Sequence, residues 1–121
     1  MVTQQIAINT ARSFVQDCKA IGLNFDKVLL FGSYARDKAH EDSDIDLLLI
    51  SKNFTDDLLT NLRSYSKINI NYPIIETHPY SLEEFNENGD FIVRVKSEGI
   101  EIVDLTKFEF KHYNLFCVPT K

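Results

Sequence analysis

The sequence predicts an α/β (α+β) fold, a small mixed β-sheet with helices packed on one face. Two observations support this prediction. Short apolar runs bounded by turn residues are typical of strands, and segments with apolar residues at helical spacing lie between them. The strands are expected at residues 27–31, 43–50, 68–77 and 100–103. The helices are expected at residues 3–21, 54–65, 82–85 and 90–97.

The ends of several helices are marked in the sequence. Gly22 ends the first helix, and Cys18 lies on the apolar stripe of that helix, which favours a core residue over a nucleophile. Ser81 and Glu84 have the spacing of a capping box, in which two side chains bond reciprocally to backbone N–H groups at a helix start. Gly99 ends the last helix before the final strand.

Length and composition are those of one globular domain. The chain has 121 residues, 44% of them hydrophobic and 26% charged, which suffices for a single core. We therefore predict one domain over residues 1–121, with 105–121 as an apolar extension. The extension is expected to pack over the domain's own core, and a contact with another subunit or protein is the alternative.

Charge and hydropathy exclude several classes of protein. No apolar stretch reaches membrane-spanning length, the N-terminus lacks the basic start of a signal peptide, and two distant cysteines suit a reducing compartment. The sequence therefore predicts a cytoplasmic protein that does not contact membranes. The net charge of −5 argues against long nucleic acid, which is held by basic patches, but it is compatible with a nucleotide bound through metal ions.

The most informative feature is a Gly-Ser turn followed ten residues later by two aspartates. Gly32 and Ser33 end one predicted strand, and Asp44 and Asp46 begin the next. Side chains two residues apart on a strand point to the same face, so the two carboxylates are expected to converge. Carboxylates in such proximity repel each other unless a cation lies between them. Their oxygens suit Mg²⁺ or Mn²⁺, which commonly share their ligands with substrate phosphates.

The turn itself is suited to phosphate binding. Gly32 allows close approach of the backbone, and Ser33 is expected to begin a helix whose free N–H groups and hydroxyl face the ligand. Arg36, one turn further on, could neutralise triphosphate charge or pair with a local carboxylate. The turn is not a Walker A loop, because no Gly-Lys-Ser/Thr follows at the required spacing.

These residues resemble the signature of the minimal nucleotidyltransferases of the DNA polymerase β nucleotidyltransferase superfamily, Gly-Ser, ten residues and Asp-x-Asp. The turn in this family usually continues to a second glycine, and Asp37 stands at that position here. The resemblance implies a polymerase β-like nucleotidyltransferase fold and Mg²⁺-dependent transfer, of the 2.7.7 class, from a nucleoside triphosphate. It implies that Gly32, Ser33 and Arg36 bind the triphosphate and that Asp44 and Asp46 are catalytic metal ligands.

The family also requires a third carboxylate on a neighbouring strand. Glu76 is the candidate, because it follows an apolar pair and precedes a His-Pro-Tyr-Ser segment that resembles relatives of this type. Its implied roles are to bind the catalytic metal and to deprotonate the attacking hydroxyl; a charged residue on an edge strand is the alternative. His78, two residues later, is expected on the same face, as a neighbour of the site or as a packed histidine.

Small chains of this family resemble antitoxins encoded beside a HEPN-domain protein, some of which add AMP to that partner. The resemblance makes ATP the expected donor and a HEPN-type protein the expected acceptor, with a homodimer as another way to complete the site. A second hypothesis is a catalytically inactive nucleotide-binding module that neutralises a partner by binding. A metal-dependent phosphohydrolase is a third, although Gly32 and Ser33 occupy the position where such enzymes carry a nucleophilic aspartate.

Overall fold

The computed structural model describes residues 2–102, which form a mixed sheet covered by helices. Its strands are β1 (Lys27–Phe31), β2 (Ile45–Ser51), β3 (Ile75–Ser81) and β4 (Ile100–Glu101). The helices are α1 (Gln4–Ala20), α2 (Leu58–Arg63), α3 (Ser66–Asn69), α4 (Leu82–Asn86) and α5 (Asp90–Glu98). The sheet order is β3-β2-β1-β4, in which β2 pairs antiparallel with β1 and parallel with β3. The predicted fold class, a small mixed sheet with helices, is confirmed.

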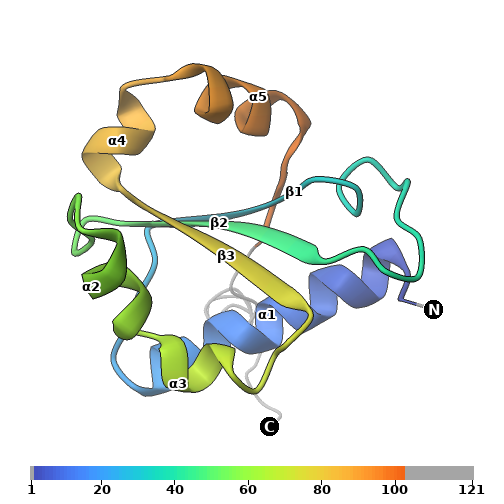
Figure 1. The fold of residues 1–121 in the computed structure, drawn as a ribbon, viewed down its shortest axis with the longest axis horizontal. Coiled ribbons are helices and arrows are strands. Elements are labelled where there is room, and N and C mark those ends of the chain that lie inside the picture. The colour runs from blue at the N-terminus through green and yellow to red at the C-terminus, as the bar shows by residue number, and fades with distance from the viewer. Residues whose placement is uncertain (1, 103–121) are drawn as a thin grey trace, which may run out of the picture.

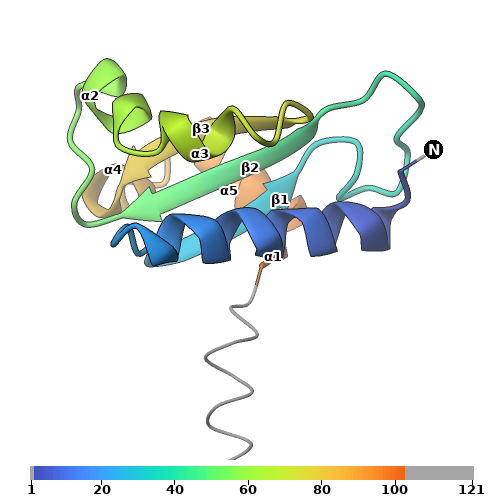
Figure 2. The same ribbon diagram turned by 90° about the horizontal axis from the view of Figure 1, so that it is seen from below.

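The helices cover both faces of the sheet, so the expectation of helices on one face is wrong. In Figure 1, α4 and α5 lie above the strands and α1 to α3 lie below them, and Figure 2 shows α1 running along the sheet. Strand residues alternate between two apolar clusters. Leu47 and Leu49 of β2 pack toward α1, whereas Leu48 and Ile50 pack toward Phe85 of α4 and toward α5. The continuous apolar run in β2 is therefore a strand buried on both sides.

The first helix follows the predicted boundaries. Thr3 caps α1 by accepting a hydrogen bond from the backbone N–H of Ile6, and Gly22 adopts a φ of 92° after the helix ends. Its buried face includes Phe14 and Cys18. Burial raises the pKa of the Cys18 thiol to about 12, so the thiol stays protonated at neutral pH and the prediction of a core residue is confirmed.

The predicted helix 54–65 is shorter in the structure because a buried asparagine organises its first residues as a loop. Asn61 accepts a hydrogen bond from the backbone N–H of Thr55 and donates one to the backbone carbonyl of Thr55, at 2.9 and 2.7 Å. These bonds satisfy the backbone of Thr55 outside a helix, so α2 begins only after Asp57.

The third predicted strand, 68–77, is wrong in its first half. Ser66–Asn69 forms the short helix α3, and a turn through Pro73 precedes β3. The strand then continues through Pro79, two residues beyond its predicted end. Pro79 is tolerated because β3 is an edge strand of the described sheet, where a missing N–H breaks no ladder.

The end of β3 leads directly into α4 through the predicted capping box. Ser81 accepts a hydrogen bond from the Glu84 backbone N–H at 3.0 Å, and the Glu84 carboxylate accepts one from the Ser81 backbone N–H at 2.9 Å. Helix α5 and the short strand β4 also follow the prediction. The apolar extension 105–121 lies outside the described residues. Within residues 2–102, no helix has the length and apolar character needed to cross a membrane.

Candidate functional site

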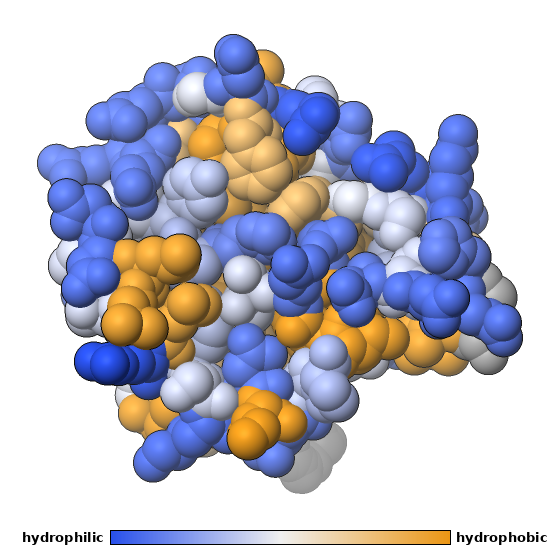
Figure 3. Space-filling model, viewed as in Figure 1, coloured by the Kyte–Doolittle hydropathy of each residue, from blue (hydrophilic) through white to orange (hydrophobic). Residues whose placement is uncertain are grey.

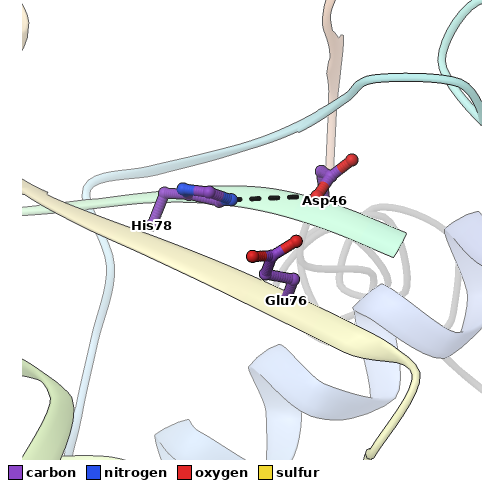
Figure 4. Close-up of side chains that lie close together, drawn as sticks. All are labelled: Asp46, Glu76 and His78. Carbon is purple, nitrogen blue, oxygen red and sulfur yellow. Dashed lines mark ion pairs between the residues drawn. The ribbon is translucent and has the colours of Figure 1, made fainter. Parts of the chain in front are cut away.

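The parallel pairing of β2 and β3 brings two of the predicted carboxylates together. Asp46 lies opposite Glu76 in the strand register, so both side chains project from the same face of the sheet. His78 projects from that face as well, because it lies two residues beyond Glu76. Oxygen atoms of Asp46 and Glu76 and a ring nitrogen of His78 all lie within 4.8 Å of one another (Figure 4). We call these three residues the acidic cluster.

The Gly-Ser turn lies against this cluster. Gly32 has a φ of 78°, a conformation that favours glycine. A Cβ atom at this position would lie 2.4 Å from Oδ2 of Asp46, far inside contact distance. The absence of a side chain at Gly32 is therefore what allows the turn to approach the carboxylate. The sequence prediction that the turn and Asp46 share one site is consistent with this contact.

Residues after Gly32 form a single helical turn rather than the predicted helix. The turn closes with hydrogen bonds from Asp37 N–H to the Tyr34 carbonyl and from Lys38 N–H to the Ser33 carbonyl, at 3.2 and 2.8 Å. This pattern is a Schellman motif, and Asp37 takes its left-handed position with a φ of 57°. The helix ends here because Asp37 leaves helical backbone geometry. Aspartate is among the few residues that tolerate this conformation in place of glycine.

The start of the turn retains unused hydrogen-bond donors. Among the described residues, no acceptor is found for the backbone N–H groups of Ser33 and Tyr34. The carbonyls of Tyr34 and Ala35 are held by the side-chain amide of Gln4, which donates to them at 3.0 and 3.3 Å. Helix α1 thus holds the turn through its carbonyl groups. The N–H groups of Ser33 and Tyr34 remain available to bind an anion.

Two other predicted site residues lie outside the acidic cluster. Asp44 is exposed and precedes β2, which begins at Ile45 rather than at residue 43. It does not join the group of mutually close ligand atoms. Arg36 is also exposed and forms an ion pair with Glu98 of α5 at 3.2 Å. It therefore pairs with a carboxylate, but with one that is 62 residues away in the sequence and not with the expected local one.

Aromatic rings form one wall of the site, a feature that the sequence analysis missed. The ring of Phe91 in α5 contacts Phe31, His78 and Tyr80, with centroid separations of 5.4, 6.2 and 5.9 Å. Figure 3 shows apolar side chains exposed between α4 and α5, with hydrophilic side chains below them over β2 and β3. No local pattern in the sequence marks this wall, because its members come from β1, β3 and α5.

The donor set of the acidic cluster fits a divalent cation. Two carboxylates and an imidazole supply hard oxygen ligands and one nitrogen ligand, a combination that divalent metals accept in proteins. Without a cation, the facing carboxylates of Asp46 and Glu76 would repel each other. The arrangement can therefore bind a metal ion beside a turn with free N–H donors.

Comparisons with known proteins found chains of similar sequence and of similar fold. Residues 11–115 match the family model described as a nucleotidyltransferase domain. A Methanocaldococcus jannaschii protein named "Putative protein adenylyltransferase" is 37% identical over 90 residues, which cover 64% of this chain and 60% of that protein. A crystal structure from Sulfolobus solfataricus, described as "a putative nucleotidyltransferase", has a TM-score of 0.59 at 20% identity and a similar fold. That match covers 81% of this chain and 80% of the other.

Proposed function

Because the chain belongs to the nucleotidyltransferase domain family, we propose that it transfers AMP from ATP to a hydroxyl group of a partner protein. One observation carries the proposal: β2 and β3 bring Asp46 and Glu76 together directly beside the turn at Gly32. That arrangement supports a site in which a metal held by the two carboxylates would lie next to N–H groups that bind phosphate. The fold by itself does not specify a reaction, so the proposal depends on this site.

We assign different roles in the reaction to different groups of the site. Asp46 and Glu76 would hold a divalent cation, Mg²⁺ or Mn²⁺. Asp44 stays a ligand predicted from the sequence alone, because it lies outside the acidic cluster. The cation, when bound, supplies charge that stabilises the phosphates and the departing pyrophosphate. The free N–H groups after Gly32 would orient the outer phosphates.

The transfer step needs only one proton acceptor. The acceptor hydroxyl oxygen forms a bond to the α-phosphorus, the bond from that phosphorus to the bridging oxygen breaks, and pyrophosphate leaves with its electron pair. Glu76, exposed beside Asp46, takes the hydroxyl proton. The remaining contribution of the protein is positioning and charge neutralisation.

The choice of donor and acceptor is supported by two likenesses. The archaeal relative is named as a protein adenylyltransferase, although the chain spans only 60% of the length of that relative. The resemblance to minimal nucleotidyltransferases adds a HEPN-type partner, with this chain as the antitoxin of a toxin–antitoxin pair. A catalytically inactive module that neutralises such a partner by binding is the second candidate. The exposed position of Asp44, outside the acidic cluster, favours that alternative.

Labelled ATP distinguishes these functions. The protein is incubated with Mg²⁺, the product of the adjacent gene, and ATP labelled at either the α- or the γ-phosphate. Label from the α-position alone should appear on the partner, and Glu76→Gln should reduce that transfer at least about 100-fold. Glu83→Gln, the same change on an exposed residue of α4, is the matched control and should transfer normally.

Each other outcome has a distinct meaning. Transfer of the γ-label would indicate phosphorylation and contradict the proposal. Tight binding of the partner without any transfer would support the non-catalytic module. Full transfer by Glu76→Gln would show that the third carboxylate is a different residue.

A further inference from the structure

His78 is the member of the acidic cluster whose function the carboxylate signature does not explain. Its Nε2 atom lies 3.7 Å from Oδ1 of Asp46, the contact drawn as a dashed line in Figure 4. The imidazole as a whole is partly exposed, at 31%, yet Nε2 is buried and has no hydrogen-bond partner among the described residues. Burying a polar atom without a partner lowers the stability of the fold, so we expect a ligand to bind this nitrogen.

The imidazole ring is held in place by its aromatic neighbours. Phe31 contacts the ring edge-on with a centroid separation of 5.1 Å, and Phe91 contacts it at 6.2 Å. These contacts come from β1 and α5, whereas His78 itself belongs to β3. Packing from two further elements restricts the rotamers of His78 and directs Nε2 toward Asp46. Such restriction before binding is characteristic of ligand positions.

The separations within the cluster suit two ligands of one ion better than a hydrogen bond. At 3.7 Å, Nε2 and the Asp46 oxygen are too far apart to share a proton. Two ligands at about 2.1 Å from a tetrahedral metal ion lie about 3.4 Å apart, close to the observed value. The Glu76 oxygen lies within 4.8 Å of both atoms, so all three could contact one ion after small side-chain rotations.

We propose that Nε2 of His78 is a third ligand beside Asp46 and Glu76, and that this set binds transition-metal ions in preference to Mg²⁺. Imidazole nitrogen is a favourable ligand for Co²⁺, Ni²⁺ and Zn²⁺, whereas Mg²⁺ prefers oxygen ligands and retains water. The inference rests on the metal-binding part of the proposed function. It does not depend on which substrate is modified or on transfer itself.

Binding of Co²⁺ alone, without nucleotide, tests the inference. Visible absorption of Co²⁺ reports both its affinity and its ligands, and competition by Mg²⁺ reports the affinity for Mg²⁺. His78→Asn, which removes Nε2, should weaken Co²⁺ at least about tenfold and change its spectrum, but should alter Mg²⁺ affinity less than about threefold. His40→Asn, the same change on an exposed loop histidine, should leave both affinities unchanged.

A second variant distinguishes the loss of a metal ligand from the loss of the fold. His78→Phe keeps an aromatic ring between Phe31 and Phe91 and lacks any ligand atom, so it should fold and show the same loss of Co²⁺ affinity. Equal Co²⁺ affinities and spectra for the wild type and both His78 variants would overturn the inference.

The carboxylate variants separate this inference from the proposed function. If Asp46→Asn and Glu76→Gln weaken Co²⁺ binding while the His78 variants do not, only the role of His78 is wrong. If none of these changes affects Co²⁺ binding, the metal site itself is wrong, and both proposals fail.

Discussion

Replacing Asp46 with asparagine is expected to reduce AMP transfer at least about 100-fold without lowering the stability of the protein. Asp46 links the two halves of the site, because it lies opposite Glu76 in the strand pair and its carboxylate lies against the turn at Gly32. The neutral amide is a poorer metal ligand than a carboxylate. It also removes the repulsion from Glu76, so the thermal unfolding temperature should stay constant or rise slightly.

The Asp46 prediction is measured as the initial rate of α-phosphate transfer, together with a thermal unfolding curve. Asp56→Asn is the matched control, since Asp56 is exposed and lies outside the acidic cluster. A variant at Asp46 that is inactive because it is unfolded would not support the account, and the unfolding curve identifies that case. Normal transfer by folded Asp46→Asn would contradict the mechanism.

Replacing Gly32 with alanine is expected to impair both stability and transfer. The new Cβ would lie 2.4 Å from Oδ2 of Asp46, and the backbone would keep a φ of 78° that alanine adopts at a cost. Strain of this kind costs about 1–3 kcal/mol, and movement of the carboxylate away from the turn should lower transfer at least about tenfold.

Gly22→Ala separates backbone strain from the contact with Asp46. Gly22 also has a positive φ, 92°, but apart from its chain neighbours no atom of residues 2–102 lies within 4 Å of the position that its Cβ would occupy. This variant should lose stability through the backbone alone and should transfer normally. Denaturant titration and transfer rates of the two variants check the prediction. Equal transfer rates for Gly32→Ala and Gly22→Ala would show that contact between the turn and Asp46 is unimportant.

Local sequence patterns predict those parts of the fold that local interactions determine. Strand β1 and the capping box of Ser81 and Glu84 appear as expected, because each depends on neighbouring residues. The prediction of a strand throughout 68–77 failed because the apolar residues of this segment do not distinguish a short helix from a strand. Helix α3 is instead linked to the start of β3 by the side chain of Asn69, which donates a hydrogen bond to the Ile75 carbonyl and accepts one from the Thr77 hydroxyl.

The placement of helices on both faces also required information beyond local patterns. The run of consecutive apolar residues in β2 indicates burial on both sides, yet it does not say which helices provide the cover. Helices α4 and α5 follow β3 in the chain and pack on the face of the sheet that carries Leu48 and Ile50.

The candidate site was predictable in composition but only partly in geometry. Gly32 and Asp46 were identified from the spacing of their motif, and their contact follows from the pairing of Phe31 with Asp46 in adjacent strands. The proximity of Glu76 depends on a parallel pairing that no local signal in the sequence specifies. The same holds for the aromatic contacts that orient His78, since they join residues from three elements.

The most direct test is the position of a bound metal and triphosphate in crystals grown with Mn²⁺ and an ATP analogue whose α,β-link cannot be cleaved. We expect an anomalous Mn²⁺ peak about 2.1 Å from carboxylate oxygens of Asp46 and Glu76, with the outer phosphates at the N–H groups after Gly32. A metal or triphosphate bound elsewhere on the protein, with these carboxylates in contact with neither, would contradict this expectation.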